Sequence, residues 1–366
     1  MPKRLLSRLL LLLASLLALA GCETAGYYAQ SIGGHLALLR AARPVPELLA
    51  DPATPAELRE RLQRSQRMRD FSVRELALPD NASYRRYAEL DRPAVVWNVA
   101  AAPPFSLELR RWCFPVAGCV GYRGYFDRAA AEAEAARLRE AEGLETVVLP
   151  VPAYSTLGKL PGDWFADPLL STLIRWPEPE LARLIFHELA HQRLYLAGDT
   201  AFNESYATAV ERLGGARWLA AEAGPEARAA DAAFEARREA FRGLVARYRA
   251  QLDALYRTGG PAERLAADKD RIYAELRAAH VALRDGAWGG DRRYDAWFAR
   301  ANNALLGLQA AYFGWVPAFE ALFEREGRDF ARFHAAVEAL AGLPAAEREA
   351  TLRALMPPEP VAPPNP

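Results

Sequence analysis

The chain has 366 residues, a length typical of roughly two domains. Hydrophobic residues make up 51% of it and charged residues 25%, which excludes a wholly disordered protein. Its 46 basic residues equal its 46 acidic ones, so no excess of positive charge indicates nucleic-acid binding, and its three cysteines are too few for a disulfide-rich miniprotein.

Residues 1–21 have the pattern of a secretory signal peptide. Three basic residues precede an apolar run, Leu9 to Ala20, that is too short to span a bilayer. The run ends in Leu-Ala-Gly-Cys, which resembles the bacterial lipobox and makes Cys22 the lipidated first residue of the mature chain. We therefore expect a lipid anchor in the bacterial cell envelope, facing the periplasm, with the outer membrane favoured over the inner one. An uncleaved anchor with an incidental cysteine is the alternative.

Short elements of both kinds follow the predicted anchor. Residues 22–50 predict a tether and a short helix, and the periodicity of 58–76 predicts a longer helix. Runs of β-branched residues at 94–99 and 145–149 predict strands. The Ala-, Glu- and Arg-rich segment 127–142 between these strands predicts a helix.

Cys113 and Cys119 are close enough in the sequence to form a disulfide bond outside the cytosol. Pro115 and Gly118 would let the loop between them fold back on itself. Two buried free thiols are the alternative. The spacing of these cysteines does not suit a metal site.

From residue 179 onward the pattern is nearly all helical. Apolar residues recur at coiled-coil spacing, and a Gly-Gly-Pro break at 259–261 predicts a helical hairpin with 262–283. The residues of this repeat are Phe234, Phe241, Val245, Tyr248, Leu252 and Leu255. Further helices are predicted at 291–311, 316–325, 328–341 and 346–355.

The strongest chemical signal is His187-Glu188-Leu-Ala-His191, an HExxH motif in a helical segment. Four residues turn a helix by about 400°, so His187 and His191 share a face and can present two imidazoles to one Zn²⁺. Glu188 lies about 100° further round, where its carboxylate can take a proton from water at the metal. Apolar flanking residues would seat this helix in a core; a chance pair on a surface helix is the alternative.

A hydrolytic zinc ion needs a third protein ligand and one open position. Gly198 and Asp199 predict the end of one helix and the cap of the next, so the two helices would form a hairpin. His191 precedes Gly198 by seven residues and Glu204 follows it by six, which brings the two level and favours Glu204 as the third ligand. Glu211 shares the face of Glu204 and could accept a hydrogen bond from the N–H of a ligand histidine. For either glutamate the alternative is a surface salt bridge.

Two resemblances support this interpretation. Residues 203–211 resemble the N-E-G-F-A-x-x-x-E segment of gluzincin aminopeptidases, in which the glutamate after the asparagine is a zinc ligand, although the spacer after the HExxH motif is shorter here. The whole mature chain resembles a bacterial family of predicted aminopeptidases, lipoproteins with an HExxH motif. The matching segments are the zinc region, 27–36, 121–126, 153–158, 302–304 and 316–319. The resemblance implies a zinc peptidase with a peptide substrate.

The chain departs from gluzincin aminopeptidases in lacking the G-A-M-E-N-type motif, whose glutamate binds the α-amine of the substrate. In its place the extended segment 145–158, with Tyr154, is the candidate edge on which a peptide lies. Asp163 or Asp167 could bind an amine, although turn formation also explains aspartates there. The residue that stabilises the oxyanion is left open among Tyr154, Tyr256, Tyr312, His280 and His334.

Together these patterns predict a mostly α-helical α+β protein with a gluzincin-like HExxH helix and a second ligand-bearing helix. Residues 51–225 would form the zinc-peptidase core, with a small mixed β-sheet N-terminal to the zinc helices. Residues 226–356 would form a helical region, including the hairpin, that packs on this core. Residues 357–366 are rich in proline and would be a disordered tail.

The predicted function is a zinc-dependent metallopeptidase with one Zn²⁺ per chain, an aminopeptidase in the first instance, that hydrolyses peptides in the cell envelope. A metallo-endopeptidase with the same site is one alternative, and dependence of cleavage on a free amine separates the two. A non-catalytic helical envelope lipoprotein is the other alternative. A closed fourth ligand, such as a third histidine at the metal, would favour it.

Overall fold

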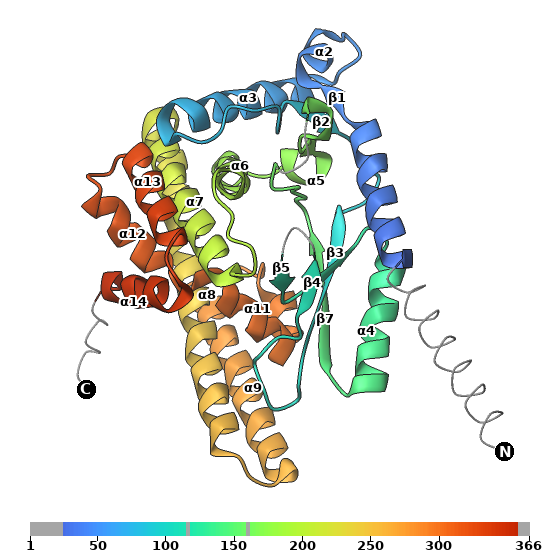
Figure 1. Ribbon diagram of the computed structural model, residues 1–366, viewed down its shortest axis with the longest axis vertical. Coiled ribbons are helices and arrows are strands. Elements are labelled where there is room, and N and C mark those ends of the chain that lie inside the picture. Colours follow the sequence, from blue (N-terminus) through green and yellow to red (C-terminus); the bar gives the residue numbers. More distant parts are fainter. Residues whose placement is uncertain (1–24, 115–117, 159–161, 358–366) are drawn as a thin grey trace, which may run out of the picture.

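The computed structural model describes residues 25–114, 118–158 and 162–357, and Figure 1 shows their arrangement. The described part is mostly helical with small β-sheets, which confirms the predicted mostly helical α+β class. The predicted signal peptide, Cys22 and the Pro-rich tail beyond residue 357 lie outside the described residues. None of the described helices is long and apolar enough to cross a membrane.

The described chain begins with a helix over residues 25–41, followed by α2 (Val45–Ala50) and α3 (Ala56–Leu76). A mixed sheet lies beside these helices, in which β2 (Arg86–Ala88) pairs antiparallel with β1 (Arg43–Pro44) and parallel with β8 (Leu169–Leu170). The single-turn elements around β8 are η1 (Asp163–Phe165) and α5 (Ser171–Ile174). These elements lead directly into the HExxH helix.

The larger sheet has β3 (Val96–Ala102) at its centre, antiparallel to both β6 (Arg123–Tyr125) and β7 (Glu145–Val151). Successive side chains of a strand point to opposite faces, and the two faces of β3 have different partners. Trp97, Val99 and Ala101 pack against α4 (Arg128–Glu142), whereas Ala100 and Ala102 pack against α11 (Asn303–Phe313). A short hairpin of β4 (Trp112–Phe114) and β5 (Gly118–Val120) follows β3 in the chain.

The helices of the metal motif are α6 (Glu178–Arg193) and α7 (Thr200–Glu222). The predicted hairpin is formed by α8 (Pro225–Thr258) and α9 (Ala262–Asp285), and α10 (Asp295–Ala299) packs beside it. The last helices are α12 (Val316–Arg325), α13 (Phe330–Ala341) and α14 (Ala345–Leu355).

The C-terminal helices pack in two separate places. Phe241, Val245, Tyr248 and Leu252 of the predicted repeat form their own core with α9 and α10. Helices α12 to α14 instead share the main core with α3, α6 and α7. Figure 1 shows the α8–α9 hairpin extending away from α12 and α13.

The prediction of one helix over 291–311 is wrong, because the chain turns between α10 and α11. The side chain of Asn302 accepts a hydrogen bond from the N–H of Leu305 and so caps a new helix. Asn302 also donates to the carbonyl of Thr146, and Arg300 donates to the carbonyl of Val148. These contacts to β7 are long-range and hold the break in place.

Candidate metal centre

The α6–α7 hairpin places the metal motif. Leu181, Ile185, Phe186 and Leu189 bury one side of α6 in the main core, as the apolar flanks of the motif predict. Helix α6 ends at Arg193, so the prediction that it ends at Gly198 is wrong. The predicted cap is confirmed, because the side chain of Asp199 accepts from the N–H of Phe202 at 3.0 Å at the start of α7.

Asn203 closes the connection between the two helices. Its Oδ1 accepts a hydrogen bond from the N–H of Leu196 at 2.8 Å, and its Nδ2 donates to the carbonyl of Leu196 at 2.7 Å. Both backbone groups of a turn residue are thus held by one buried amide. This bridge sets the register that brings the next residue, Glu204, back to α6.

His187, His191 and Glu204 converge as the sequence predicts, with one ligand atom of each lying within 4.8 Å of the others. Nε2 of His187 and Nε2 of His191 are 3.2 Å apart. Oε2 of Glu204 lies 3.4 Å from Nε2 of His187 and 3.7 Å from Nε2 of His191. In a tetrahedral zinc site with bonds of about 2.0–2.1 Å, neighbouring ligand atoms are about 3.3 Å apart.

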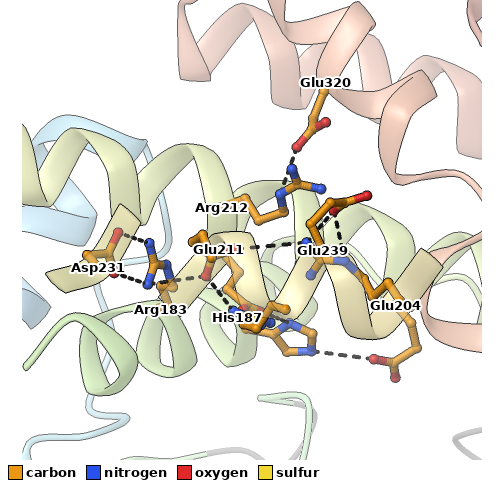
Figure 2. A network of polar contacts seen from close by, with 11 residues as sticks. Arg183, His187, Glu204, Glu211, Arg212, Asp231, Glu239 and Glu320 are labelled. Carbon is orange, nitrogen blue, oxygen red and sulfur yellow. Dashed lines mark hydrogen bonds and ion pairs between the residues drawn. The ribbon is translucent and has the colours of Figure 1, made fainter. Parts of the chain in front are cut away.

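Glu211 contacts the other nitrogen of His187, as Figure 2 shows. Nδ1 of His187 donates to Oε2 of Glu211 at 3.2 Å, and Arg238 of α8 donates to Oε1 of Glu211 at 2.9 Å. Burial would raise the pKa of Glu211, but the hydrogen bond from His187 and the charge of Arg238 outweigh it and lower that pKa to about 2. Glu211 is therefore a carboxylate, and it holds His187 with Nε2 turned toward the other ligands.

Glu204 is also kept ionised, although it is buried. Burial alone would raise the pKa of its carboxyl, but the charge of His191 and the hydrogen bond from His187 outweigh burial and hold this pKa well below its usual range. A charged carboxylate is the form that binds a metal ion. Among the described residues, no third histidine belongs to this group.

The three ligand residues line a cavity of about 460 Å³, and Glu188 lines it beside them. Leu184, His187 and Glu188 also line a second cavity of about 210 Å³, together with Glu180, Arg183 and Glu211. The half-buried Glu188 thus faces open space on both sides of the site. Tyr154 lines the larger cavity, where its ring lies 5.2 Å from that of Phe126.

The two aspartates considered for amine binding do not reach this cavity. Asp163 is exposed on η1, and Asp167 is 1% exposed behind the loop that carries Tyr154. Asp167 accepts hydrogen bonds from Ser155, from Thr156 and from Gln192 of α6. Asp167 therefore links the loop 154–157 to α6. Neither aspartate is among the described residues that line the cavity.

Three of the candidates for oxyanion stabilisation lie elsewhere in the fold. Tyr256 donates to Asn303, and His280 stacks on Phe298 within the core of the α8–α9 hairpin. His334 is buried in the main core, hydrogen-bonded to Tyr206 and to the carbonyl of Leu76. For Tyr312 the structure places only the backbone, in α11.

The structure adds two tyrosines that the sequence analysis did not single out. Tyr122 and Tyr195 line the cavity with the metal ligands, and burial followed by the charge of Glu204 raises the pKa of both phenols. Tyr195 follows His191 by four residues, a spacing that could have indicated it if the helix continued, but α6 ends at Arg193. Tyr122 carries no such signal, since it reaches the site through strand pairing.

A disulfide hairpin forms the cavity wall next to the α6–α7 turn. Cys113 and Cys119 are bonded in the structure, and Phe114 and Val120 beside them line the cavity. Arg111 donates to the carbonyls of Cys119 and of Gly198, which joins the hairpin to the turn. Gly118 lies so close to Gly198 that a Cβ built on it would be 2.5 Å from the Gly198 nitrogen, so glycine is required there.

Comparisons with known proteins agree with this geometry. No curated protein and no solved structure matches the chain. A family model described as putative aminopeptidase matches residues 26–352, a stretch that includes both metal helices and every cavity-lining residue named above. The chain therefore belongs to the putative aminopeptidase family.

Proposed function

We propose that this protein is a zinc metallopeptidase that hydrolyses peptides in the bacterial cell envelope. The observation that carries the proposal is the convergence of His187, His191 and Glu204, with spacings suited to zinc, in a cavity that Glu188 also lines. The family description supports a peptide substrate. A zinc ion held by these ligands would polarise a scissile carbonyl and acidify water beside it.

The residues of the chain have distinct parts in this proposal. Glu188 would take a proton from the attacking water and pass it to the amine that leaves, because its carboxylate is at the site without belonging to the ligand group. Glu211 and Arg238 hold the ring of His187, so that its Nε2 stays available to the metal. Tyr122, Tyr154 and Tyr195 are among the tyrosines that line the same cavity, and their phenols could donate to a developing oxyanion.

Aminopeptidase action is supported by the family description, and a specific observation supports an endopeptidase as the second candidate. Leu184, His187 and Glu188 line both cavities, so there is space on both sides of Glu188. An endopeptidase needs such space for the chain before and after the scissile bond. An aminopeptidase needs a group that binds the α-amine, and neither Asp163 nor Asp167 is among the described residues that line the two cavities.

The test is a metal analysis of the purified mature protein beside a panel of peptides with free and N-acetylated ends. One zinc per chain and cleavage that requires the free amine would support the aminopeptidase. Cleavage of free and blocked peptides at equal rates would support the endopeptidase. A metal-free protein that cleaves no peptide even after zinc is added would refute both and favour the non-catalytic lipoprotein.

A further inference from the structure

We propose that the 460 Å³ cavity binds a large apolar side chain of the substrate, aromatic or branched aliphatic, at the residue next to the scissile bond. The proposal rests on the proposed peptidase function and adds its specificity. The residues that line the cavity support it, because they are mostly apolar or aromatic and come from five segments far apart in the sequence.

One wall of the cavity is a face of the larger sheet. Val96 and Asn98 of β3, Gly124 of β6 and Val151 of β7 line it. By the alternation of the strand, this is the same face whose other end, Ala100 and Ala102, is covered by α11. The side chains of Val96 and Asn98 pack closely over Gly124, since a Cβ there would lie 3.0 Å from Cγ1 of Val96 and 3.2 Å from Oδ1 of Asn98.

Aromatic rings form much of the remaining wall. Phe114, Phe126 and Tyr154 line the cavity, and so does Tyr27 of the helix over 25–41. This helix packs tightly there, since a Cβ built on Gly34 would lie 2.2 Å from the ring of Phe126. Rings of this kind give a large apolar contact area with little loss of rotamer freedom, which suits recognition of an apolar side chain.

The distribution of charge excludes a charged side chain. Among the residues that the structure describes, no arginine or lysine lines this cavity, and its acidic groups, Glu188 and Glu204, belong to the metal site. A substrate glutamate would lose its hydration and face like charges, and a lysine would find no carboxylate other than those engaged at the metal. The 210 Å³ cavity on the other side of Glu188 differs, because Glu180, Arg183 and Arg238 line it. We therefore assign the apolar residue of the substrate to the larger cavity alone.

The experiment compares matched peptides that differ at one residue beside the cleaved bond, namely Phe, Leu, Lys or Glu, each with a free and with an acetylated end. Cleavage sites are mapped by mass spectrometry with the zinc-loaded enzyme, and kcat/KM is measured for each peptide. We expect Phe and Leu peptides to exceed Lys and Glu peptides by at least about tenfold on one side of the bond. On the other side the same exchanges should have little effect.

Two variants of the cavity wall test its location. Asn98→Asp keeps the shape of the wall but adds a carboxylate, so the ratio of kcat/KM for Lys over Phe should rise by about tenfold. Gly124→Ala would displace the side chains of Val96 and Asn98 toward the cavity and should reduce kcat/KM for Phe peptides more than for Leu peptides. Gln251→Glu, on the exposed face of α8, adds the same charge away from the cavity and should leave all ratios unchanged.

Binding to the zinc-loaded Glu188→Gln variant, measured by calorimetry, separates failure of this proposal from failure of the proposed function. Cleavage without a preference for apolar residues, or an unchanged Lys/Phe ratio in Asn98→Asp, overturns the pocket assignment while the peptidase function stands. If nothing is cleaved but Phe peptides bind at least about tenfold better than Lys and Glu peptides, the pocket stands and the peptidase function falls. If neither cleavage nor selective binding is found, both are overturned.

Discussion

Nδ1 of His187 lies 3.2 Å from Oε2 of Glu211, whereas Nε2 of the same ring lies 3.4 Å from Oε2 of Glu204. The two glutamates are seven residues apart on α7 and contact opposite nitrogens of one imidazole. A histidine can offer only one nitrogen to a metal ion, so the two contacts give these glutamates different roles. Glu204 stands with the ligand atoms, and Glu211 anchors the ring from behind with Arg238 as its partner.

The first prediction concerns these two glutamates. Glu204→Gln should lose most bound zinc, because it removes a charged ligand from a three-residue site. Glu211→Gln should keep zinc with an affinity weakened by about 10–100-fold, the usual effect of losing a partner of a ligand histidine. Zinc binding can be measured by competition with a chelator.

Glu235→Gln is the matched control for this pair. Glu235 belongs to the same network, where it pairs with Arg183 and Arg238, but it contacts neither histidine of the site. The zinc affinity of the Glu235→Gln variant should stay near that of the wild type. Equal zinc loss in Glu204→Gln and Glu211→Gln, or loss in the latter alone, would overturn the ligand assignment.

The second prediction concerns Glu188. Glu188→Gln keeps the size and helix propensity of the residue but cannot accept a proton. Zinc content and melting temperature should stay near wild type, while peptide hydrolysis falls by about 10²–10⁴-fold, the usual contribution of a general base. Glu178→Gln, in the first turn of the same helix, is the control and should retain activity. Loss of zinc from Glu188→Gln would instead mean that Glu188 helps to hold the metal.

The third prediction is a pH dependence of stability that comes from His334. Burial, aided by the charge of Arg193 and opposed by the hydrogen bond to Leu76, lowers the pKa of His334 to about 4. Nε2–H donates to the carbonyl of Leu76 and Nδ1 accepts from the hydroxyl of Tyr206, so the neutral ring satisfies both partners. Arg193 is itself paired with Glu338, which lies one turn after His334 on α13.

Because the folded pKa is below the unfolded value of about 6.5, the stabilisation is present above that pH and is lost as the pH falls toward 4. The full difference corresponds to about 3 kcal/mol of unfolding free energy. His334→Gln can make both hydrogen bonds without titrating, so its stability should fall less between pH 7 and pH 4. Urea unfolding of both proteins at several pH values measures the difference, and parallel curves would contradict the prediction.

The fourth prediction concerns the N-terminus. The Leu-Ala-Gly-Cys sequence predicts that mature protein extracted from membranes carries a diacylglyceryl-sized addition on Cys22. Mass spectrometry of the N-terminal peptide checks this directly. Cys22→Ser should abolish the addition and release the protein from the membrane fraction. A wild-type protein that is soluble and starts at another residue would refute both the lipid anchor and the proposed attachment to the envelope.

The sequence by itself determined the parts of this protein that depend on local geometry. The helical repeat places His187 and His191 on one face, and Asp199 caps the second helix, although the first helix ends at Arg193 and not at Gly198. These short-range rules sufficed to predict that Glu204 would meet the histidines and that a hairpin would follow near residue 258. They failed at 291–311, where contacts of Arg300 and Asn302 to the distant β7 break the helix.

Only the tertiary structure decided what surrounds the metal ligands. Tyr27, Asn98, Tyr122 and Tyr154 meet in one cavity, because strand pairing and helix packing bring together segments that no sequence period relates. The same packing buries Asp167 behind a loop and His334 in the core, so two residues with suitable chemistry are kept from the site. Residue type and spacing indicate which chemistry a side chain can perform. Whether it reaches the metal depends on long-range contacts, whose partners are specified by the whole fold.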